Sequence, residues 1–368
     1  MKVLTIIGAR PQFVKASVVS MALKKQGIEE IIIHTGQHYD EKMSEIFFTE
    51  MNIPKPAYNL QIGNLSHGAM TGRMIEKIEA LITELKPDYL MVYGDTNSTM
   101  AGAIAASKTK VKMVHIEAGL RSFNMNMPEE VNRIVTDRLS DILFCPTTTA
   151  IQNLKLEGFD HFTTKQKKKI RVELIGDVMK DAAEYFSGFA EEKSTGPVKE
   201  IVKQPFALCT LHRAENLGDL GRLQHIFDAL NEISQQLKIV LPMHPGTKKT
   251  VEQGNIQIAA GIEVMEPVGF FDMLTLLKHT TCVFTDSGGL QKEAYFSKKP
   301  CITLRDETEW VELVEHGYNK LAGADKDLIL QAFAAIDTMD LANAKPLYGE
   351  GFVSDSIAAI LKEDYEGK

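Results

Sequence analysis

The chain has 368 residues and a net charge of −8, with 44% hydrophobic and 24% charged residues; this is ordinary globular usage, unlike that of disordered chains. The acidic balance argues against a nucleic-acid-binding face, although a few clustered cations can still attract a small anion. Residues 1–8 have too short an apolar core for a signal peptide, and no apolar run reaches the roughly 18–20 residues that cross a bilayer. We expect a cytoplasmic protein of two domains, without a membrane partner.

The cysteines lie in widely separated apolar runs and lack the Cys-x-x-Cys spacing of metal and redox sites. This pattern predicts reduced core residues and no metal centre. The residues are Cys145, Cys209, Cys282 and Cys301.

Apolar, β-rich runs alternate with helix-length segments through the first half of the chain. The expected strands are 3–7, 31–34, 89–92, 112–116, 142–145 and 170–175. The expected helices are 12–24, 71–85, 129–139 and 149–157. Strands separated by helices indicate βαβ crossovers and a parallel sheet.

Segment 186–204 interrupts this alternation. It is rich in Ser, Gly, Glu and Lys with little apolar periodicity, which predicts a linker. The alternation then resumes, with strands at 206–210, 239–243, 283–285 and 301–304 and helices at 220–237 and 270–278. We predict an α/β protein of two doubly wound, Rossmann-like domains facing a cleft, since such sheets bind ligands beyond the carboxyl ends of their strands. The domains would span residues 1–185 and 186–349.

The first predicted strand runs into Gly8-Ala9-Arg10-Pro11, and Lys15 follows one turn into the next helix. Glycine permits a tight turn, proline suits a helix start, and a helix N-terminus attracts anions. An ordinary helix start with two solvated cations explains the pattern equally well. The chain has neither the dinucleotide-binding Gly-x-Gly-x-x-Gly pattern nor a Walker A loop, which disfavours an NAD- or ATP-driven reaction.

Carboxylates follow the next predicted strand ends of this half. Asp95 and Glu117 each come directly after a buried strand, and Glu129 and Glu130 occupy the first turn of a later helix. Asp95 would also serve as a helix cap, and acids in a first turn favour the helix dipole. Several carboxylates so close together in one βαβ unit favour acid/base chemistry.

In the second half, His212 and Arg213 follow the first predicted strand, and His244 ends the next one. A single histidine is often structural, but a His-Arg pair at such a strand end favours a role in the site. For His244, a simple turn is an equally good interpretation.

The strongest local signal is Ser287-Gly288-Gly289, where a predicted strand runs into a helix. This turn exposes backbone N–H groups at a helix N-terminus, which suits a phosphate. Glu293, one turn later, would accept hydrogen bonds from ribose hydroxyls, and Arg305 adds a cation after the following strand. The residues alone thus predict a nucleotide-phosphate site in the second domain and carboxylates in the first, which suits a nucleotide-sugar enzyme.

Six motifs in one order resemble the non-hydrolysing UDP-N-acetylglucosamine 2-epimerase family over nearly the whole chain. They are Gly8-Ala9-Arg10-Pro11, Gly94-Asp95-Thr96, His115-Ile116-Glu117-Ala118-Gly119-Leu120-Arg121, Pro128-Glu129-Glu130-x-Asn132-Arg133, His212-Arg213-x-Glu215-Asn216 and Asp286-Ser287-Gly288-Gly289-x-Gln291-x-Glu293. The resemblance implies a GT-B-like fold in which the C-terminal helix, within 350–368, packs back on the N-terminal domain. It also implies a homodimer.

The resemblance further implies a mechanism without a cofactor. UDP is eliminated across carbons 1 and 2 to give 2-acetamidoglucal, and it adds again after protonation of carbon 2 on the other face, which needs acid/base groups and stabilisation of the leaving pyrophosphate. By motif position, the catalytic residues are Asp95, Glu117, Glu129 and His212. The residues that would hold UDP are Arg10, Lys15, Arg133, Arg213, Ser287, Gly288, Gly289 and Glu293.

Three departures from the family pattern concern the substrate. Gln12 stands where a Glu usually follows Arg-Pro, the loop between Arg121 and Pro128 is short, and Trp310-Val311 replaces the usual Arg-Pro. These features resemble the branch that acts on UDP-2,3-diacetamido-2,3-dideoxyglucuronate in surface-polysaccharide synthesis. The sequence leaves open which UDP-N-acetylhexosamine is the substrate.

Some bacterial members of the family are activated by UDP-N-acetylglucosamine at a second site. Gln37 and Arg73 match the positions involved, but Asp40 stands where a second glutamine is usual. Its carboxylate would repel phosphates, so we expect weak or no activation.

Other functions stay open on the sequence. A GT-B glycosyltransferase would share the fold and the UDP site, although the acids at Asp95, Glu117 and Glu129 disfavour it. A hydrolysing 2-epimerase would release free N-acetylmannosamine, and a non-catalytic nucleotide-sugar sensor is a third alternative.

Overall fold

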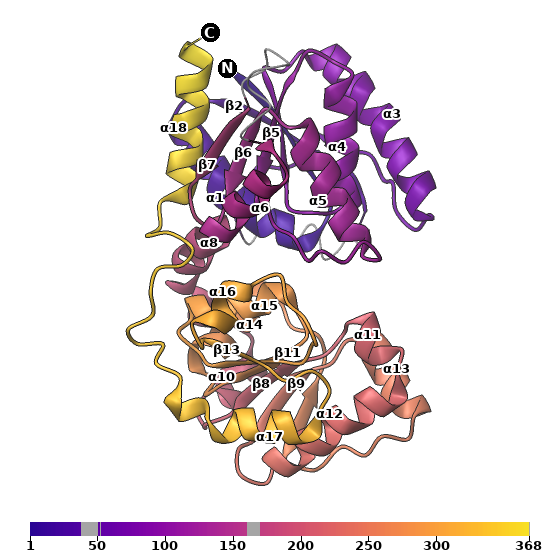
Figure 1. Cartoon of the computed structure of the whole chain (residues 1–368), viewed down its shortest axis with the longest axis vertical. Coiled ribbons are helices and arrows are strands. Elements are labelled where there is room, and N and C mark those ends of the chain that lie inside the picture. Colours follow the sequence, from indigo (N-terminus) through magenta and orange to yellow (C-terminus); the bar gives the residue numbers. More distant parts are fainter. Residues whose placement is uncertain (38–50, 52, 160–169, 368) are drawn as a thin grey trace. The chain divides into compact units, whose positions relative to one another are not determined.

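The structure is a computed structural model that describes residues 1–37, 51, 53–159 and 170–367. The chain forms two compact units, Met1–Ala182 with Pro346–Lys368 (unit 1) and Ala183–Lys345 (unit 2) (Figure 1). Each unit contains a parallel sheet with helices, which confirms the predicted α/β class.

Unit 1 is built on a sheet of strand order β3-β2-β1-β4-β5-β6-β7, in which all described pairings are parallel. Its strands are β1 (Lys2–Ile7), β2 (Glu29–His34), β3 (Tyr58–Asn59), β4 (Tyr89–Tyr93), β5 (Lys112–Ile116), β6 (Ile142–Cys145) and β7 (Arg171–Leu174). Its helices are α1 (Arg10–Lys25), α3 (His67–Leu85), α4 (Asn97–Ser107), α5 (Pro128–Leu139), α6 (Thr148–Leu156) and α18 (Val353–Glu366), and α8 (Val178–Ser187) continues into unit 2.

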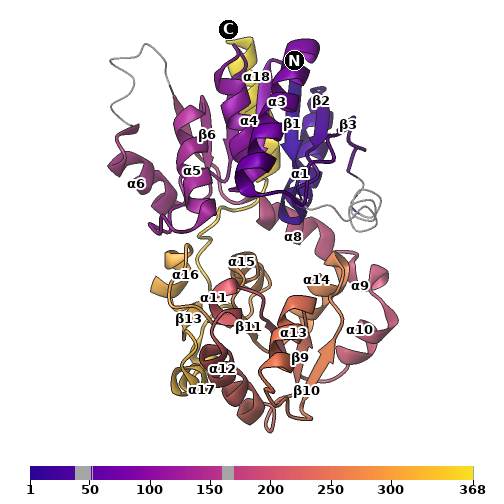
Figure 2. The same cartoon turned by 90° about the vertical axis from the view of Figure 1, so that its right-hand side faces the viewer.

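The strand order of unit 1 reverses between β1 and β4. The crossover through α1 leads from β1 to β2, whereas that through α4 leads the opposite way from β4 to β5. Because parallel crossovers are right-handed, the two helices cover opposite faces of the sheet. Helices α3, α4 and α5 lie side by side (Figure 2). The carboxyl ends of β1, β4 and β5 therefore meet at the switch point, where such sheets bind ligands.

The C-terminal helix α18 packs on unit 1, as predicted. Asp364 accepts hydrogen bonds from the Tyr89 hydroxyl at 2.5 Å and from Lys112 Nζ at 2.7 Å. Asp355 pairs with Lys25 of α1 at 3.1 Å. Residues from β4, β5 and α1 thus hold a helix that is more than 180 residues away in sequence from all of them.

Unit 2 repeats the architecture with the strand order β10-β9-β8-β11-β12-β13, again parallel throughout its described pairings. Its strands are β8 (Ala207–Thr210), β9 (Ile239–Pro242), β10 (Ile262–Met265), β11 (Val283–Thr285), β12 (Cys301–Thr303) and β13 (Asn319–Leu321). Its helices are α9 (Ala190–Lys193), α10 (Gly196–Ile201), α11 (Ala214–Leu217), α12 (Leu220–Ile233), α13 (Pro245–Gln253), α14 (Phe270–His279), α15 (Gly288–Phe296), α16 (Val311–Glu315), α17 (Lys326–Ala334) and the 3₁₀ helix η2 (Ile336–Thr338).

The prediction of a linker at 186–204 is wrong, because this segment forms α9 and α10 and packs into the core of unit 2. Phe186 meets Phe270 edge-to-face at 5.4 Å, and Val198 is fully buried. The Thr195 N–H donates to Asp272 at 2.7 Å. The polar residues that suggested a linker form helix caps and turns, while a few apolar residues bury the segment.

All four cysteines are free and buried, as expected, and burial raises the pKa of each thiol. In the described part of the chain, no helix has the length and apolar character needed to span a membrane.

Candidate active site

The turn after β1 is held by Gln12, a residue that the sequence analysis noted only as a departure. Its Oε1 accepts hydrogen bonds from the Gly8 and Ala9 N–H groups at 2.8 and 3.0 Å. Its Nε2 donates to the Tyr93 carbonyl at 2.8 Å. Gln12 therefore ties the turn after β1 to the end of β4.

Lys15 and Glu117 come together at the carboxyl ends of β1 and β5. They form an ion pair, and their side chains are 8% and 10% exposed. Glu117 has a φ of +72°, a left-handed conformation that is costly for a residue with a side chain. Both residues line a small pocket with Asp177. The sequence predicted Lys15 and Glu117 as parts of two separate motifs, and the structure shows that they form one ion pair.

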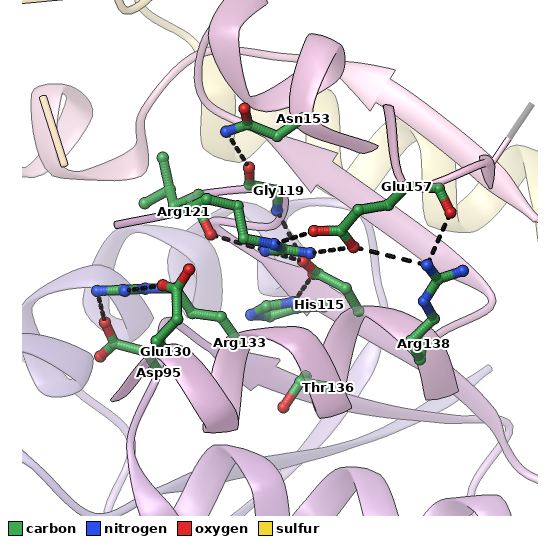
Figure 3. Close-up of polar contacts among 12 residues, drawn as sticks. Asp95, His115, Gly119, Arg121, Glu130, Arg133, Thr136, Arg138, Asn153 and Glu157 are labelled. Carbon is green, nitrogen blue, oxygen red and sulfur yellow. Dashed lines mark hydrogen bonds and ion pairs between the residues drawn. The ribbon is translucent and has the colours of Figure 1, made fainter. Parts of the chain in front are cut away.

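Asp95 pairs with Arg133, which comes from the second turn of α5 (Figure 3). Arg133 Nη2 donates to Asp95 Oδ2 at 2.6 Å, and Nη1 donates to Glu130 Oε2 at 2.7 Å. Burial opposes ionisation of Glu130, but hydrogen bonds from the Ser122 N–H, Arg133 and the Phe123 N–H outweigh it and lower the pKa of Glu130 on balance. Glu130 is thus a buried anchor for Arg133 and for the loop before α5.

Glu129, the neighbour of Glu130, has a different environment. Its side chain is partly buried, and among the described residues its carboxylate makes no hydrogen bond or ion pair. Of the two acids in the first turn of α5, Glu129 is the one available to a ligand.

A second, fully buried network, which includes His115 and Arg121, lies beside these acids (Figure 3). His115 of β5 contacts Asp137 Oδ1 through Nδ1 at 2.7 Å and the Gly94 carbonyl through Nε2 at 2.8 Å. Asp137 Oδ2 accepts from the Gly119 N–H at 3.1 Å and from Arg121 at 2.7 Å. His115 lies within one of the six motifs, but the motif predicted no role for it, and no local signal pointed to Asp137, whose partners are distant in sequence.

In unit 2, Asp286 organises the residues that follow β8. It is fully buried and accepts from the backbone N–H groups of His212 at 3.0 Å and Arg213 at 2.9 Å. The His212 side chain, 45% exposed, lies with Nδ1 3.3 Å from Asp286. Burial lowers the pKa of His212, and the Asp286 charge offsets only part of that effect. His212 is thereby favoured in its neutral form.

The Ser-Gly-Gly turn begins α15, as the sequence predicts. Ser287 caps the helix by accepting from the Leu290 N–H. A Cβ on Gly288 would lie 2.1 Å from Glu309 Oε1, so any larger residue there would displace the Glu309 carboxylate. Arg305 is buried, and its Nη1 donates to Glu309 Oε2 at 2.8 Å. Gly289 is exposed at the helix N-terminus, and Glu293 is partly buried on the next turn.

Four further predicted positions are His244, Arg10, Asp40 and Gln37. His244 caps α13 by accepting from the Gly246 N–H at 3.1 Å, which is the turn interpretation of that residue. The side chain of Arg10 and the whole of Asp40 lie outside the described residues. Gln37 is described, and its Oε1 accepts from the Ser98 hydroxyl at 2.7 Å. In the described part of the chain, no three His, Cys, Asp or Glu residues lie close enough to hold a metal ion.

Residues 21–362 match a family model described as UDP-N-acetylglucosamine 2-epimerase. The chain is similar to the UDP-2,3-diacetamido-2,3-dideoxy-D-glucuronate 2-epimerase of Pseudomonas aeruginosa, with 52% identity over 98% of this chain and 99% of that protein. It is also similar to the crystal structure of Methanocaldococcus jannaschii UDP-GlcNAc 2-epimerase in complex with UDP-GlcNAc and UDP, with 41% identity, a TM-score of 0.88, and coverage of 99% of this chain and 100% of that chain. The glycosyltransferase WaaG, 10% identical with a TM-score of 0.58 over 98% of this chain and 99% of its own, shares the fold alone.

Proposed function

The chain belongs to the UDP-N-acetylglucosamine 2-epimerase family, and on that premise we propose that it inverts carbon 2 of UDP-2,3-diacetamido-2,3-dideoxyglucuronate for surface-polysaccharide synthesis. It is an isomerase that acts on a UDP-N-acetylhexosamine. The uronate is favoured because the Pseudomonas relative shares more of this sequence than the Methanocaldococcus enzyme does. UDP-GlcNAc is the second candidate substrate.

The observation that carries the proposed mechanism is the pairing of two carboxylates at neighbouring strand ends with cations. Asp95 pairs with Arg133, and Glu117 pairs with Lys15. Each carboxylate thus has a cation beside it, and a carboxylate held in place in this way is a suitable group to accept a proton. Glu129, whose carboxylate has no described partner, adds a third acid/base group to this unit.

The proposed reaction begins when one carboxylate takes the proton from carbon 2. The bond between carbon 1 and the β-phosphate oxygen breaks, its electron pair leaves with UDP, and a double bond forms between carbons 1 and 2. A carboxylic acid then protonates carbon 2 from the other face, and the UDP oxygen bonds to carbon 1 again. No electrons are gained or lost overall, so the balance needs no external oxidant or reductant.

In this proposal the residues of unit 2 bind the nucleotide. The N-terminus of α15, at Ser287, Gly288 and Gly289, would receive phosphate oxygens, while Glu293 accepts from ribose hydroxyls. His212, favoured as a neutral imidazole, would hydrogen-bond the leaving phosphate, and Arg213 would neutralise its charge. Arg305 supports this turn through Glu309.

The test is deuterium exchange at carbon 2 without an acceptor sugar. In deuterium oxide, the uronate substrate should gain one deuterium at carbon 2 in both epimers, with traces of UDP and the glycal. We expect kcat/KM for the uronate to exceed that for UDP-GlcNAc by ~100-fold, because polar groups that match a substrate strongly reject an analogue without their partners. A higher kcat/KM for UDP-GlcNAc would reverse the substrate assignment.

The other functions give different products in the same experiment. A glycosyltransferase leaves the carbon 2 hydrogen in place, and a hydrolysing epimerase accumulates the free sugar. Absence of exchange with either substrate would overturn the proposal.

The oligomeric state and the cellular location of the enzyme are also proposals. We propose that it works as a homodimer in the cytoplasm, in keeping with the four free cysteines. Sedimentation at micromolar concentration tests the dimer.

A further inference from the structure

His115 and Asp137 form a dyad that is buried away from solvent. Both side chains have zero exposed area. His115 Nε2 lies 2.8 Å from the Gly94 carbonyl oxygen, which can only accept, so Nε2 carries a hydrogen. Nδ1 lies 2.7 Å from Asp137 Oδ1.

A second cation, Arg121, also contacts the dyad. Burial alone would raise the pKa of Asp137, but the hydrogen bonds and charges of His115 and Arg121 lower it on balance. Arg121 donates to Asp137 Oδ2 at 2.7 Å and to Glu157 Oε2 at 3.0 Å, so two carboxylates share its charge.

The contacts of the dyad fall on the two turns that carry the proposed acids. Gly94 directly precedes Asp95, and Asp137 also accepts from the N–H of Gly119, two residues after Glu117. These turns are left-handed, with φ of +62° at Gly94, +72° at Glu117 and +79° at Gly119. A left-handed Glu persists only when the surrounding structure holds it there.

We propose that His115 and Asp137 are positioning residues, which set the carboxylates of Asp95 and Glu117 by fixing the Gly94 carbonyl and the Gly119 N–H. The inference rests on the proposed 2-epimerase function and deepens it. Reacting groups must be held within a fraction of an ångström, and a misplacement of about 1 Å costs about 100-fold in rate. The dyad provides that constraint from the buried faces of strand β5 and helix α5.

Two amide variants separate the two contacts of the ring, because each places an amide nitrogen near the position of one ring nitrogen. In His115→Gln the amide nitrogen matches Nε2 and still donates to the Gly94 carbonyl. In His115→Asn it matches Nδ1, donates to Asp137 and leaves the Gly94 carbonyl without its donor. We expect kcat to fall ~100-fold in His115→Asn and ~10-fold in His115→Gln, with KM and UDP affinity within ~3-fold of wild type.

Asp137→Asn is the conservative rescue. Its amide oxygen still accepts from Gly119 and Arg121, and its amide nitrogen can donate to His115 Nδ1 while Nε2 keeps its hydrogen bond to the Gly94 carbonyl. We expect kcat within ~10-fold of wild type. The matched control is His34→Asn, because His34 is also a buried histidine near the end of a strand with a hydrogen bond to the backbone. Its Nδ1 accepts from the Gly36 N–H at 2.9 Å. This control should lose thermal stability but keep its kcat.

The readout is carbon 2 deuterium exchange in folded protein, with unfolding midpoints measured in parallel. A His115→Asn variant with kcat within ~3-fold of wild type, or with no greater loss of kcat than His34→Asn at equal stability, would overturn the positioning role. If His115→Asn does not fold, Asp137→Ser takes its place, with the same expected loss of kcat because it removes the acceptor of the Gly119 N–H. Absence of exchange in wild type would instead overturn the 2-epimerase function and, with it, this inference.

Discussion

Lys15 reaches across the end of β4 to form its ion pair with Glu117, and Gly94 provides the space for that contact. A Cβ at Gly94 would lie 3.1 Å from Glu117 Oε2 and 3.6 Å from Lys15 Nζ. The turns after β1, β4 and β5 are therefore coupled by one pair of nearly buried charges. Breaking a buried pair by removing one partner leaves the other charge uncompensated, which is strongly destabilising.

Lys15→Gln should lower kcat/KM by at least ~10-fold, because a nearly buried Glu117 loses its counter-charge and the substrate loses a cation. Steady-state exchange kinetics measure this effect. The matched control is Lys25→Gln, whose cation is 68% exposed and pairs with Asp355; surface pairs of this kind contribute about 0–1 kcal/mol. Equal kinetics for the two variants would contradict a role for Lys15.

Replacement by glutamine should have different effects at the neighbouring residues Glu129 and Glu130: the first change should lower turnover, and the second should lower stability. Glu129→Gln should reduce turnover by ~100-fold, the scale of lost acid/base catalysis, with an unchanged unfolding midpoint. Glu130→Gln should cost about 1–3 kcal/mol of stability, because Glu130 holds Arg133 and the Ser122 and Phe123 N–H groups through charged hydrogen bonds. Turnover assays and urea unfolding of both variants separate the two roles.

Asp95→Asn and Glu117→Gln should each lower turnover by at least ~100-fold while circular dichroism stays unchanged. Near-normal turnover in either variant would remove that residue from the mechanism.

Gln12→Glu should destabilise the protein by about 1–3 kcal/mol. The amide nitrogen of Gln12 donates to the Tyr93 carbonyl and contacts the Thr96 and Thr99 hydroxyls, each at 3.0 Å. A carboxylate has no hydrogen for the carbonyl, although the hydroxyls can rotate to donate to it. Urea unfolding measures the loss, and an unchanged midpoint would show that this rotation compensates fully.

Glu30→Gln should stabilise the protein at neutral pH. Glu30 is partly buried, with its Oε2 atom shielded from solvent, and Oε1 accepts from the Thr5 hydroxyl at 2.6 Å. Burial of the carboxyl group raises its pKa above the ordinary 4.5. Because the folded-state pKa exceeds the unfolded one, the carboxyl favours folding below the unfolded value, and that contribution is lost as the pH rises through the folded value. The variant should exceed wild type by at least ~1 kcal/mol at pH 8, and the difference should shrink toward pH 4.5. A difference that is independent of pH would show that Glu30 does not titrate.

Local pattern in the sequence was sufficient for the alternation of strands and helices, the reduced cysteines and the Ser-Gly-Gly turn at the start of α15. These features depend on residues close together in the chain: apolar runs bury a strand, and Ser287 caps the helix that follows it. The order of the six motifs along the chain was sufficient to identify the family. The linker prediction for segment 186–204 was wrong because polar residues of helix caps and turns dominate its local composition. Its burial depends instead on Phe270 and Asp272, which are more than 65 residues away in sequence.

Tertiary structure alone decided which polar residues face one another. Glu129 and Glu130 are equivalent in sequence, but the packing of α5 leaves the first without a described partner and buries the second against Arg133. His115 and Asp137 are 22 residues apart, and they meet because β5 and α5 pack together behind the turns at Gly94 and Gly119. Periodicity encodes which face of an element is buried, whereas the partner of a buried charge depends on strand order and helix packing, which no local pattern contains.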